Sequence, residues 1–175
     1  MKKQDNGRID KSVYDLLCKQ IEAEWNSMLL YRQIQGICDA NKMPNAGKYF
    51  SYRADEEITH ANKFSDYLTK RGAKIPEFSI KPSKIDFDGT LLCLVEIAFE
   101  HEQEVTESIV NIALACDKAK DMITRDFLSW FITEQIEEES TFDTIIEEIE
   151  KANGDIAAIQ CIEWGLPYRS EVKAN

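Results

Sequence analysis

Helical periodicity sustained over four long stretches is the feature that most limits what this chain can fold into. Glycine and proline are sparse, at seven and four in 175 residues, and apolar residues recur at the three- and four-residue spacing of one helix face. We predict helices over about residues 10–37, 44–71, 88–116 and 120–151, with Gly36 near the end of the first. A shorter fifth helix is predicted over about 155–164, where the segment WGLPYRS would end it.

The links between these helices predict how they are connected. The first two helices, and the third and fourth, are joined by short turns, which favours antiparallel pairs. The segment GAKIPEFSIKPSKIDFDG separates the second helix from the third. Extended, such a link reaches roughly 50 Å, enough to run the length of a ~42 Å helix. The sequence therefore predicts an all-α, up-down four-helix bundle with one long crossover, as a single domain over 1–175 with its core at about 10–151.

Composition and charge exclude several classes of function. Hydrophobic residues make up 43% and charged residues 30%, which is typical of a globular domain. The net charge of −11 would repel a phosphate backbone, so we expect no nucleic-acid partner. The five cysteines contain no C-x-x-C pair, which argues against a disulfide framework or a thiolate metal site. With no long apolar run, we expect no membrane segment and a cytoplasmic location.

Glutamate interrupts the apolar face of every long predicted helix near its middle. The four central glutamates are Glu24, Glu57, Glu102 and Glu138. Because the midpoints of equal helices share one layer in an up-down bundle, we expect these four carboxylates to converge. His60 follows Glu57 by one turn and can point the same way.

Such a cluster of buried carboxylates needs neutralisation, because each unpaired charge costs several kcal/mol. Arg53, one turn before Glu57, and Arg32 could offset part of it. Metal binding accounts for the rest, and an oxygen-rich set with one histidine suits iron or manganese. His101 lies off this face, so we expect a surface or outer role for it. Tyr31 lies on the face of Glu24, where it packs in the core or stands beside the metals.

Four segments resemble bacterial-type non-haem ferritins. They read EAEWNSMLLY, RADEEITHANKFSDYL, EHEQEVTESI and FLSWFITEQIEEESTF, and the resemblance covers about residues 14–150. The E-x-x-H of the second segment and the E-Q-x-E-E-E of the fourth are specific in combination. The resemblance implies a ferritin-like bundle whose crossover joins the second and third helices.

The resemblance also implies roles for individual residues. A first iron would be held by Glu24, Glu57 and His60. Glu57 would bridge to a second iron held by Glu102 and Glu138, with Gln135 close by. The third iron position of the family is matched by Glu56, Glu134, Glu137 and Glu138. Tyr31 matches the tyrosine beside the centre.

By the same resemblance, the chain would be a ferroxidase that oxidises Fe²⁺ with O₂ or H₂O₂. It would bind two to three irons per subunit and store ferric mineral in a hollow homo-oligomer of 24 subunits. No methionine stands out as a haem ligand, so no haem is predicted. The terminal segment CIEWGLPYRSEVKAN departs from the family, which leaves the shell contacts open.

Two other functions compete with this one. A rubrerythrin-like di-iron peroxidase would carry Glu-x-x-His on two helices, whereas the fourth helix here has Glu134-x-x-Glu137 without histidine. A ferritin-like scaffold subunit that does not mineralise would need no metal ligands, and the full ligand set counts against it.

Overall fold

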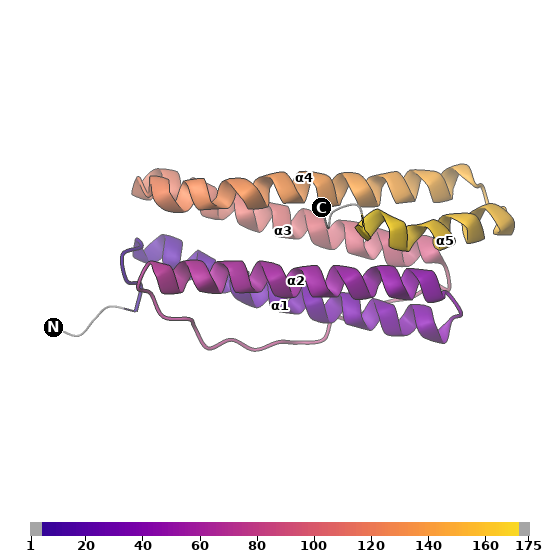
Figure 1. The fold of residues 1–175 in the computed structure, drawn as a ribbon, viewed down its shortest axis with the longest axis horizontal. Helices are drawn as coiled ribbons and strands as arrows, with labels where there is room; N and C mark the ends of the chain where they lie inside the picture. The colour runs from indigo at the N-terminus through magenta and orange to yellow at the C-terminus, as the bar shows by residue number, and fades with distance from the viewer. Residues whose placement is uncertain (1–4, 172–175) are drawn as a thin grey trace.

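A computed structural model describes residues 5–171, and the predicted four-helix bundle with a fifth, C-terminal helix is confirmed (Figure 1). The bundle helices are α1 (Lys11–Ala40), α2 (Pro44–Lys70), α3 (Leu91–Ala119) and α4 (Met122–Lys151). The fifth helix, α5 (Ile156–Glu171), folds back from the end of α4 and packs against α2 and α4. None of the helices in this part of the chain is long and apolar enough to cross a membrane.

Side chains just before three of the helices fix where those helices begin. The carboxylate of Asp10 accepts from the backbone N–H of Ser12 at 2.8 Å, which satisfies a donor in the first turn of α1. Thr90 caps α3 and Asp121 caps α4 in the same way. α2 differs, because Met43 precedes it and offers no capping side chain.

The first turn of α2 is capped instead by Glu163, a buried residue of α5. Its carboxylate accepts from the backbone N–H of Asn45 at 2.7 Å and of Ala46 at 2.9 Å. A negative charge at a helix N-terminus also interacts favourably with the helix dipole. This contact ties the C-terminal helix to the bundle and gives α2 the cap that its own sequence lacks.

Three helices end later than the sequence predicts, and α3 begins and ends three residues later than the predicted 88–116. α1 continues past Gly36 to Ala40, because Cys38 is fully buried in the core and holds the last turn in place. α5 continues through Pro167 to Glu171, so the prediction that WGLPYRS ends it was wrong. Leu166 is completely buried against the bundle core, and such packing outweighs the backbone hydrogen bond that proline removes.

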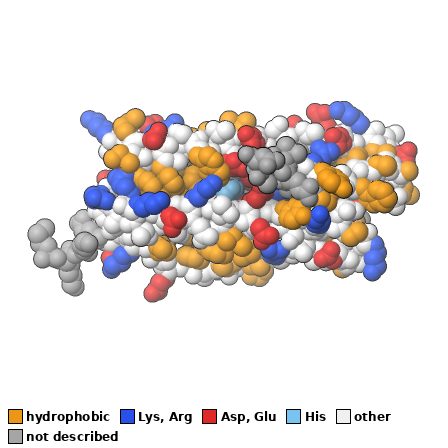
Figure 2. All heavy atoms as spheres, viewed as in Figure 1, with side chains coloured by type: hydrophobic (Ala, Val, Ile, Leu, Met, Phe, Trp, Pro, Cys, Tyr) orange, Lys and Arg blue, Asp and Glu red, His pale blue; other side chains and the backbone are white. Residues whose placement is uncertain are grey.

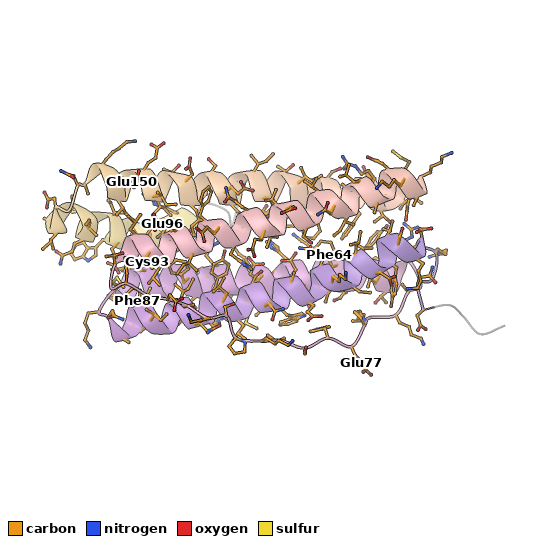
Figure 3. The ribbon with its side chains drawn as sticks, turned by 180° about the vertical axis from the view of Figure 1, so that it is seen from behind. Phe64, Glu77, Phe87, Cys93, Glu96 and Glu150 are labelled. Carbon is orange, nitrogen blue, oxygen red and sulfur yellow. The ribbon has the colours of Figure 1, made fainter. Side chains whose placement is uncertain are left out.

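The crossover at residues 71–90 runs in extended form along α1 and makes α2 and α3 parallel (Figure 1). Gln33 of α1 donates to the carbonyl of Ser83 at 2.9 Å and accepts from its N–H at 3.0 Å. Trp25 stacks on Phe78 of the crossover, with 6.5 Å between ring centroids. Figure 3 shows this segment from behind, with Glu77 pointing away from the bundle.

The bundle core is divided into two apolar halves. One half contains Tyr31, Phe50 and Phe142 and receives α5. The other contains Phe64, which Figure 3 shows between the helices, and Phe131, stacked on it at 4.1 Å. The layer between the two halves is polar, and it contains the glutamates that interrupt each apolar face.

Candidate metal centre

The polar layer brings together one glutamate from each bundle helix and one histidine. At most 4% of any of these side chains is exposed: Glu24, Glu57, His60, Glu102 and Glu138. Within two triads, one ligand atom per residue lies within 4.8 Å of the others. The first triad is Glu24, Glu57 and His60, and the second is Glu57, Glu102 and Glu138. We call these five residues the carboxylate cluster; Glu57 belongs to both triads.

Helix geometry places Glu57 and His60 on one side of α2. Three residues apart, they stand one above the other, and Nδ1 of His60 is 3.4 Å from a carboxylate oxygen of Glu57. Glu56 points about a quarter-turn away and is half-buried. The doubled glutamate thus places one carboxylate in the bundle interior and one at its edge.

Buried amides and a phenol hold the carboxylates in place. Gln20 donates to Glu24 at 2.9 Å, and Gln135 donates to Glu102 at 3.0 Å. The hydroxyl of Tyr31 donates to the other oxygen of Glu102. Gln20 was not among the predicted site residues, although its position one turn before Glu24, on the same face, is the signal that could have found it.

Arg53 is the buried cation of this layer, with 2% of its surface exposed. Its guanidinium lies 2.8 Å from Glu138, 3.9 Å from Glu102 and 2.6 Å from Glu56. Arg32 does not reach the cluster; it forms an outward ion pair with Asp55 at 2.5 Å. Of the two arginines considered from sequence, one therefore offsets part of the negative charge.

The remaining charge changes the acidity of the cluster. Burial, followed by the charges of neighbouring glutamates, raises the pKa of Glu24 and of Glu102 well above its ordinary value. Burial alone would lower the pKa of His60, but the hydrogen bond and charge of Glu57 outweigh it and raise that pKa. The metal-free site therefore holds protons that a cation would replace, and carboxylate oxygens with one imidazole fit a hard divalent ion.

A pocket of about 350 Å³ opens beside the cluster, between α2 and α4. Glu56, His60, Trp130, Glu134 and Glu137 are among the residues that line it. A further potential triad joins the pocket to the interior through His60, Glu134 and Glu138. Figure 2 shows the face formed by α2 and α4, on which a histidine side chain is visible. Metal ions could reach the cluster from solvent through this pocket.

The structure refines the expected places of Glu134 and His101. Glu134, predicted as a ligand of the third iron position, is half-buried in the pocket wall, whereas the next residue, Gln135, is 3% exposed and points into the interior. His101 is half-buried rather than on the surface, with a ring nitrogen 2.7 Å from the hydroxyl of Ser27. Its ring also meets Tyr31 edge-on at 6.3 Å, which places it behind the tyrosine.

Comparison with known proteins gives a consistent result. The chain matches the ferritin-like domain over residues 14–152. It is 30% identical over 162 residues to bacterial non-haem ferritins of Staphylococcus saprophyticus and Staphylococcus aureus. The alignments cover 93% of this chain and 96% and 97% of those proteins. An open-pore ferritin from the hyperthermophilic archaeon Archaeoglobus fulgidus superposes with a TM-score of 0.88 at 27% identity, covering 92% of this chain and 98% of that one.

The fold and the sequence similarity cover nearly the whole chain, and both show that the protein belongs to the ferritin family.

Proposed function

We propose that this protein is an iron-storage ferritin that oxidises Fe²⁺ at the carboxylate cluster. The observation that carries the proposal is the pair of buried triads that share Glu57. Two metal ions bridged by one carboxylate would lie close enough to act on the same oxidant. Glu24 and His60 complete the first position, and Glu102 and Glu138 complete the second. Tyr31 and Gln135 position Glu102 through their hydrogen bonds.

Fe²⁺ is the substrate in this scheme, and each of two ions gives up one electron. Together they reduce O₂ to H₂O₂ with the uptake of two protons, or H₂O₂ to water. Carboxylate oxygens favour the harder Fe³⁺ and so favour oxidation. The protons held by Glu24 and Glu102 leave as Fe²⁺ binds, because a metal-bound carboxylate must be ionised.

The pocket is the proposed route between the cluster and solvent. Glu56, Glu134 and Glu137, together with Glu138, would form a third, peripheral iron position there. Half-buried and exposed carboxylates bind iron weakly, since water competes for the ion. Weak binding suits a position that passes iron onward to the mineral.

We propose a homo-oligomeric shell of about 24 subunits, by analogy with the ferritin relatives. The surfaces of the bundle and of α5 carry large exposed apolar side chains that such contacts would cover: Leu114, Met122, Ile123, Ile136 and Trp164. We also propose a cytoplasmic location, which agrees with the five cysteines that form no disulfide.

The test is an anaerobic Fe²⁺ titration followed by exposure to O₂, with native mass measured on the same preparation. We expect two or three Fe²⁺ bound per subunit, fast oxidation, and a mass of about 24 times the 20.1 kDa subunit. Absence of tight Fe²⁺ binding would overturn the proposed function, whatever the mass. Tight binding in a small oligomer would retain the oxidation site and overturn the shell.

A further inference from the structure

Arg53 distinguishes the two positions of the carboxylate cluster. Its guanidinium contacts Glu138 at 2.8 Å and lies 3.9 Å from Glu102, and both carboxylates belong to the second triad. Its other nitrogen contacts Glu56 at 2.6 Å. A buried positive charge therefore lies beside the second triad, and not midway between the two triads.

Charge alone would otherwise favour the second position. The second triad consists of three carboxylates, whereas the first has two carboxylates and an imidazole. More anionic ligands attract a divalent cation more strongly. Arg53 cancels this advantage, because its single positive charge offsets one of the three carboxylates, and a cation that enters there must also displace it from Glu138.

Arg53 is also held firmly enough to compete. It is 2% exposed, and its guanidinium carbon lies 5.5 Å from the centre of the Phe142 ring. A guanidinium in a water-poor site interacts with carboxylates far more strongly than one on the surface. Glu56, at the pocket edge, would remain the ion-pair partner of Arg53 when Glu138 binds a metal ion.

We propose that Arg53 is a positioning residue, a resident counter-cation that stabilises the metal-free second triad and must yield Glu138 before a metal ion binds there. The inference rests on the proposed function. It makes metal binding stepwise: the triad of Glu24, Glu57 and His60 fills first, and the second ion binds more weakly. Glu56 is then a partner of Arg53 as well as a pocket carboxylate.

The chain offers a matched control in an ion pair that joins α1 and α2 at the surface. The buried Arg53 pairs with the half-buried Glu56, and Arg32 pairs with Asp55 at the surface. Arg53→Gln and Arg32→Gln therefore make the same substitution in a buried and an exposed arginine–carboxylate pair. Glu56→Gln and Asp55→Asn likewise neutralise the carboxylate partner in each of the two ion pairs.

The experiment is calorimetric titration of the full-length, metal-free protein with Zn²⁺, which does not change oxidation state. In wild type we expect two binding steps, the weaker one lost in Glu102→Gln. Arg53→Gln should tighten the weaker step at least tenfold, which is about 1.4 kcal/mol, and Arg32→Gln should leave it unchanged. A second readout is thermal unfolding without metal, where Arg53→Gln should melt roughly 5 °C or more below wild type and regain the difference with Zn²⁺.

Glu56→Gln keeps the inference testable if Arg53→Gln does not fold. With Glu56 neutral, Arg53 should hold Glu138 more tightly and weaken the second Zn²⁺ step at least threefold, whereas Asp55→Asn should not. Equal second-step affinities in wild type, Arg53→Gln and Glu56→Gln would overturn the role of Arg53 and leave the proposed function standing. If wild type binds no Zn²⁺ and no Fe²⁺, the proposed function and this inference both fall.

Discussion

Replacing Glu57 with glutamine should change the stability of the protein in opposite directions without and with metal. Glu57 lies within 4.8 Å of carboxylates in both triads. Two unit charges at 4.8 Å repel by about 3.5 kcal/mol at an effective dielectric constant of 20. Partial protonation of the neighbours and the lost attraction to His60 reduce this gain. We expect metal-free Glu57→Gln to be about 1–3 kcal/mol more stable than wild type.

With metal bound, wild type should be more stable than Glu57→Gln. A ligand present at a hundred times its dissociation constant stabilises the folded state by about 2.7 kcal/mol. Since Glu57 serves both triads, Glu57→Gln weakens both positions and should retain less than about 1 kcal/mol of that stabilisation. Fast Fe²⁺ oxidation should disappear while the oligomer persists.

The assay is urea unfolding followed by circular dichroism, at one fixed protein concentration, with a chelator or with excess Zn²⁺. Glu104→Gln, an exposed change on α3, is the control and should match wild type in both conditions. A metal-free Glu57→Gln protein less stable than wild type, with a full Zn²⁺ effect, would refute the shared role of Glu57.

Three further predictions follow from the same contacts. The stability of the metal-free protein should fall as pH rises from about 5 to 9, because folding raises the pKa values of Glu24, Glu102 and His60. Over this range the folded protein keeps protons that the unfolded chain has already released. A pH series of urea midpoints checks this, and excess Zn²⁺ should flatten the curve. Glu163→Ala should cost about 2–3 kcal/mol, since it leaves the backbone N–H groups of Asn45 and Ala46 in the first turn of α2 without their acceptor. An unchanged urea midpoint would show that the cap is unimportant. Tyr31→Phe should slow Fe²⁺ oxidation several-fold with little change in Zn²⁺ affinity, because it removes a hydrogen bond to Glu102 and no metal ligand. Stopped-flow absorbance measures the oxidation rate, and calorimetry measures the Zn²⁺ affinity.

The sequence determined the helices and the existence of a polar layer. Periodicity is local, so each apolar face, and each glutamate that interrupts it, can be identified within one helix. The length of the crossover then set the direction of α3, and equal helix lengths predicted that Glu24, Glu57, Glu102 and Glu138 share one level. The end of α5 was misjudged, because local rules for Pro167 ignore the burial of Leu166.

Tertiary structure decided what depends on distances between helices. Sequence allowed both Arg53 and Arg32 to face the cluster, and only packing turned Arg53 inward and Arg32 toward Asp55. The cap that Glu163 gives to α2 joins residues more than a hundred positions apart, which no local pattern records. The net charge of the cluster depends on the position of Arg53, because a guanidinium 2.8 Å from Glu138 offsets the charge of that carboxylate, whereas a guanidinium on the surface does not.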